Sequence, residues 1–141
     1  MKISYDPPPN LSDIQKVFDV LPTSVFCYGS IIYNPNKCPI DIPIMAHEET
    51  HSRQQGDDPA GWWKKYLEDV EFRIEQEVAA YQVQYWLQCK IIKNRDTRAL
   101  NLTRLAQSLS GGMYGCTMSL AEAKRLIQWK QKTTKKTKKS N

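Results

Sequence analysis

Two histidines, His47 and His51, lie four residues apart and enclose a glutamate in the segment HEETH. On a helix, residues four apart lie on the same face, so both imidazoles can reach one metal ion. Glu48 follows the first histidine directly, and we expect its carboxylate to take a proton from water that the metal activates. The spacing therefore predicts a helix that carries a hydrolytic metal site, with Zn²⁺ as the expected ion.

The third metal ligand must come from elsewhere in the chain. The sequence contains two histidines, and both lie in this motif. A catalytic zinc site needs three protein ligands and one open position, so the third ligand cannot be a histidine. The candidates are the acidic residues of a later predicted helix and the cysteines: Asp69, Glu71, Glu75, Glu77, Cys27, Cys38, Cys89 and Cys116.

Two of these candidates, Glu75 and Glu77, lie in the middle of that predicted helix. Helical phase does not choose between them, because both flank its apolar spine at similar angles. Ala80 favours Glu77, because a ligand helix must approach the histidine helix closely and a small residue three positions on permits this.

The HExxH motif, followed by Glu77-x-x-Ala80, resembles the gluzincin branch of the zincin metallopeptidases, in which a glutamate on a later helix is the third ligand. The surrounding segment is also similar to short metallopeptidase-like proteins of phage and bacterial genomes. The resemblance covers roughly residues 40–90. It implies a zinc site with His47, His51 and Glu77 as ligands and Glu48 as catalytic base.

Three residues depart from the usual zincin pattern. Glu49 stands where zincins usually have an uncharged residue, and Arg53 stands where they usually have an apolar one. Tyr81 follows Ala80, where many gluzincins have Asp or Asn. These departures concern the substrate class and the efficiency of catalysis more than metal binding.

Other residues are candidates for supporting roles. Tyr114 lies in a glycine-rich loop, SGGMYG, and its hydroxyl is a candidate catalytic donor to a developing oxyanion. Metal-bound imidazoles usually donate their second N–H group to a neighbour. Gln54, Gln55 and Glu71 are the candidates for that partner. The aromatic residues Trp62, Trp63, Tyr66 and Trp86 are expected to pack in the core.

The elements that position these residues are mostly helices. Apolar spacing, caps and turn residues predict helices over 11–20, 41–55, about 58–67 and about 69–93, one around Leu102–Leu109, and one from Ser119 to Trp129. Residues 24–33 predict a strand or a hairpin that turns at Gly29. We expect a mostly helical α+β fold, a compact minimal zincin-like domain over 1–129 with a small sheet or hairpin.

The charge distribution separates a nearly neutral domain from a basic tail. The net charge is +5, but residues 130–141 hold six of the 20 basic residues and no acid. The remaining 14 basic and 15 acidic residues give 1–129 a net charge of −1. This argues against a nucleic-acid-binding face on the domain. We expect the Lys-rich tail to be flexible and to contact a polyanion only weakly.

The compartment is predicted from three absences in the sequence. No apolar run is long enough for a membrane span, and MKISYDPPPN lacks the apolar core of a signal peptide. The four cysteines are scattered, without a CxxC pair, so reduced and mostly buried thiols are expected. Together these features predict a cytoplasmic, intracellular protein.

The leading hypothesis is a zinc-dependent metallopeptidase that acts on a peptide or protein substrate. One alternative is a non-catalytic, zinc-stabilised binding module with a basic tail. Another is a different zinc amidohydrolase, resembling deformylases, with Cys38 as third ligand. A DNA-associated protein driven by the tail is a further alternative.

Overall fold

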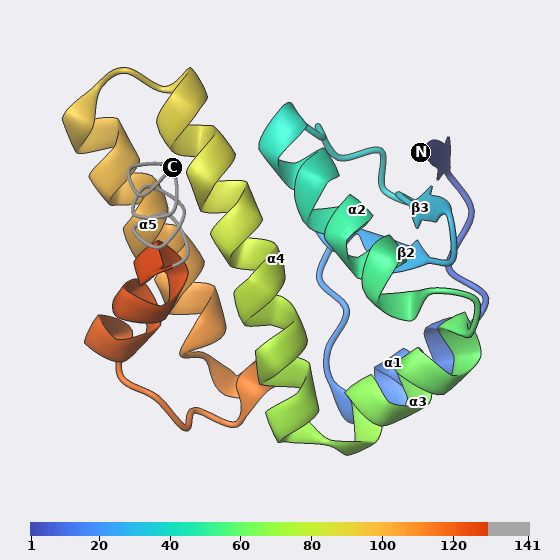
Figure 1. Cartoon of the computed structure of the whole chain (residues 1–141). Helices are drawn as coiled ribbons and strands as arrows, with labels where there is room; N and C mark the ends of the chain where they lie inside the picture. The colour runs from blue at the N-terminus through green and yellow to red at the C-terminus, as the bar shows by residue number, and fades with distance from the viewer. Residues whose placement is uncertain (130–141) are drawn as a thin grey trace, which may run out of the picture.

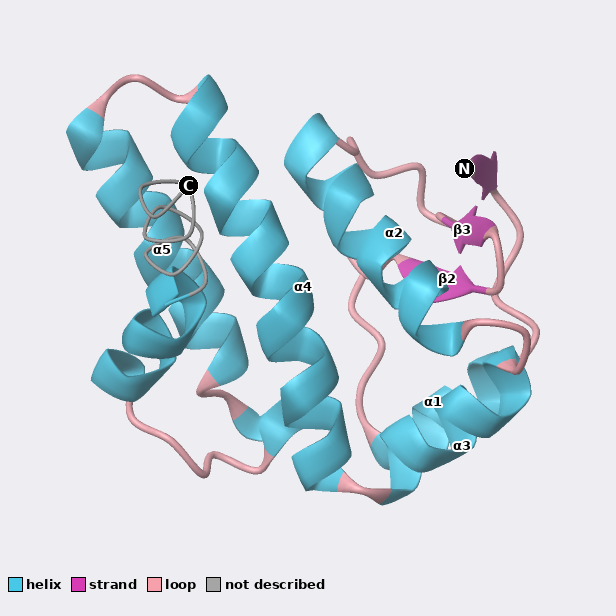
Figure 2. Ribbon diagram, viewed as in Figure 1, coloured by secondary structure: helices cyan, strands magenta, loops and turns pink. Residues whose placement is uncertain are grey.

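The computed structural model describes residues 1–129, and the predicted tail at 130–141 lies outside them. The described residues form a mostly helical α+β fold with one small sheet (Figure 2), which confirms the predicted fold class. In chain order the elements are β1 (Lys2–Ser4), α1 (Leu11–Val17), β2 (Phe26–Tyr28), β3 (Ile31–Tyr33), α2 (Ile42–Gln55), α3 (Pro59–Glu68), α4 (Val70–Ile91), α5 (Arg95–Leu109) and the short 3₁₀ helix η1 (Gly112–Tyr114). Residues 120–129 are helical.

The sheet has the order β1-β3-β2, with β3 in the centre. β2 and β3 form the predicted antiparallel hairpin, and Gly29 supplies the left-handed conformation of its turn, with φ 62°. β1 pairs in parallel with β3, Lys2 opposite Ile31. The sequence predicts no strand in residues 1–10. This pairing was missed because three residues before a run of prolines carry too little periodicity to indicate a strand.

Helix α2 carries the histidines and has the bounds that its capping residues predicted. The Asp41 carboxylate accepts a hydrogen bond of 2.9 Å from the Ile44 N–H group, and Pro43 lies in the first turn. At the other end Gly56 takes a positive φ of 57°. Two other predicted helices are shorter than expected, because Phe18 and Ile92 adopt extended backbone and end α1 and α4.

Helix α4 runs through the middle of the fold, between α2 on one side and α5 on the other (Figure 1). Its predicted apolar spine packs towards α5 through Ile74, Val78, Tyr81, Tyr85 and Cys89. A second row of buried residues, Arg73, Glu77, Ala80 and Gln84, is spaced three or four apart and shares another face of the helix. Ala80 is fully buried, as expected for a position where two helices approach closely.

Two hydrophobic clusters form the core, one where α4, α5 and η1 meet and one where α1, β2 and α3 meet. We call them the C-terminal cluster (Tyr85, Leu102, Leu105, Ala106, Leu109, Tyr114, Ala123 and Ile127) and the N-terminal cluster (Ile14, Phe26, Trp62, Trp63 and Tyr66). The core positions predicted for Trp62, Trp63 and Tyr66 are confirmed. Trp86 is only half-buried, with the Lys90 ammonium 3.7 Å from its ring centroid.

All four cysteines are free thiols. Only Cys27 is fully buried, whereas Cys116 is exposed, so the expectation of mostly buried thiols was wrong. No helix within 1–129 is both long and apolar enough to cross a membrane.

Gln55, at the end of α2, joins this helix to the hairpin. Its side-chain N–H₂ group donates to the Cys27 carbonyl at 2.8 Å, and its carbonyl accepts from the Gly29 N–H group at 2.7 Å. The Gln55 side chain is buried; its bond to the Cys27 carbonyl is buried as well, and its bond to the Gly29 N–H group is partly buried. Gln55 therefore sets where the sheet lies relative to the histidine helix.

We expect Gln55→Leu to lower the free energy of unfolding by about 1–2 kcal/mol, because the Gly29 N–H group loses its partner and the Cys27 carbonyl keeps only the Trp63 indole N–H group as donor. Urea denaturation followed by circular dichroism measures this. The control is Gln107→Leu, at an exposed position of α5, which should change stability by no more than about 0.5 kcal/mol. An unchanged midpoint in Gln55→Leu would show that the hairpin does not depend on this side chain.

Candidate metal centre

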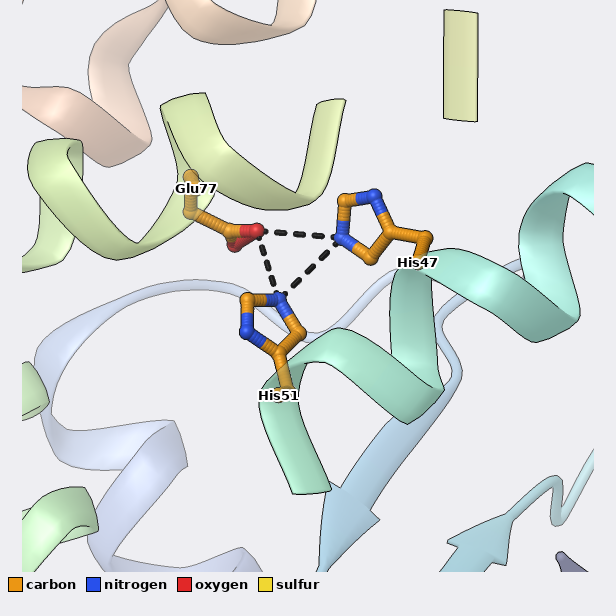
Figure 3. Close-up of side chains that lie close together, drawn as sticks. All are labelled: His47, His51 and Glu77. Carbon is orange, nitrogen blue, oxygen red and sulfur yellow. Dashed lines mark hydrogen bonds and ion pairs between the residues drawn. The ribbon is translucent and has the colours of Figure 1, made fainter. Parts of the chain in front are cut away.

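His47 and His51 from α2 and Glu77 from α4 point towards one another (Figure 3). The Nε2 atoms of the two histidines are 3.2 Å apart. Glu77 Oε1 lies 3.1 Å from His47 Nε2 and 2.8 Å from His51 Nε2. All three side chains are buried, so three metal-ligating atoms converge on one small volume away from bulk water.

The donor set and its dimensions fit a transition metal such as zinc. Two imidazoles and one carboxylate are a known ligand set of catalytic zinc, which binds these donors at about 2.0–2.2 Å. In a tetrahedral site this places neighbouring ligand atoms about 3.3 Å apart. The observed separations of 2.8 to 3.2 Å are slightly shorter. His47, His51 and Glu77 could therefore hold one metal ion with little movement.

The structure shows which of the candidate third ligands lies beside the two histidines. Glu77 joins the cluster, whereas Glu75 is exposed on α4 and does not take part. Cys38 is also outside the cluster, because its thiol donates to the Pro22 carbonyl at 3.3 Å. Glu77 lies on the face of α4 that meets α2, whereas Glu75 lies on a face exposed to solvent.

Gln54 orients His51, as one of the predicted partners of the imidazoles. Its side-chain oxygen lies 2.8 Å from His51 Nδ1, and its N–H₂ group donates to the Gln76 carbonyl on α4 at 3.0 Å. Because a carbonyl oxygen only accepts, the proton of neutral His51 must be on Nδ1, which leaves the Nε2 lone pair facing the cluster. The other two predicted partners were wrong: Gln55 holds the hairpin, and Glu71 is exposed.

The second oxygen of Glu77 is held by two tyrosines. Glu77 Oε2 accepts hydrogen bonds from the Tyr66 hydroxyl at 2.8 Å and from the Tyr114 hydroxyl at 3.1 Å. Tyr66 belongs to the N-terminal cluster and Tyr114 to the C-terminal cluster. These bonds turn Oε1 towards the imidazoles, so Oε1 is the oxygen available to a metal. Sequence reasoning had placed Tyr66 in the core only, although a buried tyrosine hydroxyl usually signals a polar partner.

The electrostatics of the cluster favour charge separation between Glu77 and His51. Burial alone would raise the pKa of Glu77, but the two imidazoles outweigh it and hold this pKa well below its usual range. Burial likewise disfavours protonated His51, but the Glu77 carboxylate outweighs it and raises the pKa of His51 to about 9. When no metal is bound, the proton on His51 therefore supplies the positive charge that a metal ion would otherwise place beside Glu77.

Glu48 differs from His47, His51 and Glu77 in making no side-chain hydrogen bond within the described residues. Its carboxylate is buried, yet it makes no hydrogen bond with any residue of 1–129. Burial raises its pKa, and the nearby histidines only partly oppose this shift. A buried carboxylate that is free of hydrogen bonds and has a raised pKa is suited to exchange protons, as a general base requires.

The loop that carries Tyr114 is attached to α4 by Arg73. The Arg73 guanidinium is buried and donates to three backbone carbonyls, those of Tyr66 at 2.8 Å, Leu67 at 2.9 Å and Met113 at 2.6 Å. It therefore joins the end of α3 to the loop beside Tyr114. Sequence reasoning missed this residue, because a lone arginine on a helix does not reveal which carbonyls it will meet.

One cavity, with a volume of about 230 Å³, opens beside the cluster. Its lining includes His47, Glu48, His51, Glu77 and Tyr114, together with residues 18–21, 24 and 25 of the segment between α1 and β2 and the first two residues of β2. The predicted ligands, base and donor therefore border the same space.

Comparison of the chain with protein-family models, with curated proteins and with solved structures gave no match.

The tyrosine contacts make a prediction about metal affinity. We expect Tyr66→Phe to weaken Zn²⁺ binding about tenfold, and the double variant with Tyr114→Phe to weaken it up to about 100-fold, because the ligand carboxylate loses its orienting donors. Competition with a zinc-binding dye measures the affinity. Tyr33→Phe, on β3 outside the site, is the matched control and should bind Zn²⁺ like the native protein. Equal affinities in all four proteins would contradict the orienting role.

Proposed function

We propose that this protein is a zinc-dependent metallopeptidase, with His47, His51 and Glu77 as zinc ligands and Glu48 as general base. The main support for the proposal is that two features line the same cavity. Three metal-ligating atoms lie within 4.8 Å of one another, and a buried, unpartnered glutamate is adjacent to them. The resemblance of the HExxH and Glu77-x-x-Ala80 segments to gluzincins supports the same reaction.

The residues divide the work of hydrolysis between them. Bound zinc supplies Lewis acidity, which lowers the pKa of water and polarises a carbonyl group. Glu48 accepts the proton of the attacking water and returns it to the leaving amine. Its raised pKa brings it closer to neutral pH, where a carboxylate can both take and give a proton. Glu77 and His51 stay fixed throughout, because Gln54, Tyr66 and Tyr114 hold them, whereas His47 is oriented only by its contacts within the cluster.

Tyr114 has a second, catalytic role in this proposal. Its side chain lines the cavity, and its hydroxyl donates to Glu77 Oε2. A hydroxyl has one proton to donate, so stabilising an oxyanion requires the substrate oxygen to replace Glu77 as acceptor. Tyr66 would then keep Glu77 Oε2 in place through its own hydrogen bond.

A zinc-stabilised binding module is the second candidate function. Glu77 contacts both hydrophobic clusters through the tyrosines, as a structural metal site could. Structural zinc sites, however, normally use four protein ligands, and the cluster formed within 1–129 offers three. An unpartnered glutamate beside the site also has no purpose in a structural centre. These two observations favour the enzyme.

We place the reaction in a reducing, intracellular compartment. The four cysteines are free, and Cys116 is exposed to solvent. Exposed free thiols persist where the surroundings keep them reduced.

Metal content tests the ligand assignment. We expect purified protein to hold one zinc per chain, and His47→Ala, His51→Ala and Glu77→Gln each to lose most of it, because a three-ligand site cannot spare a ligand. Inductively coupled plasma mass spectrometry measures the ratio. Glu75→Gln is the control, on the exposed face of the same helix, and should retain zinc. Undiminished zinc in both histidine variants would remove the basis of the proposal.

Glu48→Gln separates catalysis from metal binding. This variant should keep its zinc and lower the rate of peptide hydrolysis at least about 100-fold, since it removes the proton acceptor and no ligand. A mixture of internally quenched peptides gives the rate. Glu49→Gln, the neighbouring residue, should hydrolyse at close to the native rate. Native activity in Glu48→Gln would assign the chemistry to another group, and no hydrolysis by the zinc-loaded native protein would favour the binding module.

A further inference from the structure

The cavity beside the metal centre has an apolar wall. Apart from the cluster and its aromatic neighbours, its lining includes Phe18, Val20, Leu21, Val25, Phe26 and Met113. Most of these residues come from the irregular segment between α1 and β2, opposite the histidine helix. Two of them remain exposed, Leu21 by 59% and Met113 by 37%. Apolar side chains exposed to solvent at a cavity indicate contact with an apolar ligand group.

The charged residues of the lining are all acidic apart from the two histidines. Asp19, Glu48 and Glu77 contribute carboxylates, and no lysine or arginine of the described chain lines the cavity. Arg73 is buried nearby, against the rings of Phe18 and Tyr66. Its three nitrogen atoms already donate to backbone carbonyls. Apart from the proposed zinc, which would polarise the scissile carbonyl, the site thus offers no free cation to pair with a carboxylate on a substrate.

The size of the cavity limits what can enter it. At about 230 Å³ it is smaller than the roughly 300–1,000 Å³ of pockets that enclose a whole ligand. It has room for one side chain and the peptide group that reacts. The rest of a longer substrate must therefore lie outside, along the surface.

We infer that the substrate is the interior of a peptide chain, cleaved beside an uncharged apolar residue whose side chain fills this cavity. The inference rests on the proposed peptidase function; the lining argues against a carboxypeptidase in particular, and a peptide with a free amine beside the residue separates the endopeptidase from an aminopeptidase. An enzyme that removes C-terminal residues must hold a free carboxylate in addition to the scissile carbonyl, and burying one among carboxylates with no lysine or arginine to pair with it is strongly unfavourable. An acidic side chain beside the scissile bond is excluded for the same reason.

A series of internally quenched peptides tests this preference. The peptides are blocked at both ends and differ only in one residue next to the scissile bond, which is Leu, Phe, Asp or Lys. Two further Leu peptides place a free carboxylate or a free amine next to that residue. We expect kcat/KM for the blocked Leu and Phe peptides to exceed that of the Asp and free-carboxylate peptides at least about tenfold. Faster cleavage of any charged or unblocked peptide would overturn the inference.

Leu21→Lys tests whether the apolar, cation-free wall sets the preference. Because Leu21 is largely exposed, the variant should fold normally. A lysine there supplies the missing cation, so the ratio of kcat/KM for the Asp peptide to that for the Leu peptide should rise at least about tenfold. Leu100→Lys, at an exposed leucine of α5 outside the cavity, is the matched control and should keep the native ratio. An unchanged ratio in Leu21→Lys would contradict the role of this wall.

Binding separates failure of this inference from failure of the proposed function. If the native protein hydrolyses none of the peptides, the peptidase proposal fails. The same peptides are therefore also titrated into zinc-loaded Glu48→Gln, and binding is followed by fluorescence anisotropy. Tighter binding of the Leu and Phe peptides than of the Asp peptide would support the apolar pocket even without hydrolysis. Equal or reversed affinities would overturn it even if hydrolysis occurs.

Discussion

The fold is organised around one buried negative charge, the carboxylate of Glu77. An ionised carboxylate is stable away from water only if both of its oxygens have partners. Oε1 faces the two imidazoles of α2, and Oε2 accepts from Tyr66 on α3 and Tyr114 on the loop that follows α5. Each tyrosine belongs to a different hydrophobic cluster, so satisfying this charge also sets how the two clusters meet. The same contacts leave a single oxygen directed at the metal position.

The parts of this site that could be predicted from the sequence are those that depend on local geometry. His47 and His51 face the same way because of their spacing, and the bounds of α2 follow from Asp41 and Gly56. Glu77 could be separated from Glu75 only by the packing of α4 on α2, because helical phase alone treats them alike. Tyr66 and Arg73 act through contacts with segments distant in sequence. Hydrophobic periodicity carries no information about such contacts, so their roles became visible only in the structure.

The two ligand helices are joined directly as well as through the cluster. Gln54 contacts His51 with one end of its amide and the backbone of α4 with the other. Burial of Ala80 between the helices allows this short link. The distance between the histidines and Glu77 is thus maintained by protein groups, and a metal need not draw the helices together. A site arranged in this way could bind the proposed ion with little loss of conformational freedom.

The segment between α1 and β2 shares one wall of the cavity without belonging to a helix or strand. Leu21, Pro22 and Thr23 are exposed there, whereas the ligands and Glu48 lie on helices that are packed on several sides. Loop positions with few packing contacts accept substitutions and insertions at little expense in stability. Under the proposed function, changes in this short stretch would therefore alter which substrate side chain is accepted while the residues of the metal centre stay in place. Substitution of a few exposed residues in this segment, in evolution or by design, could therefore vary the substrate preference of the proposed enzyme without changing its metal centre.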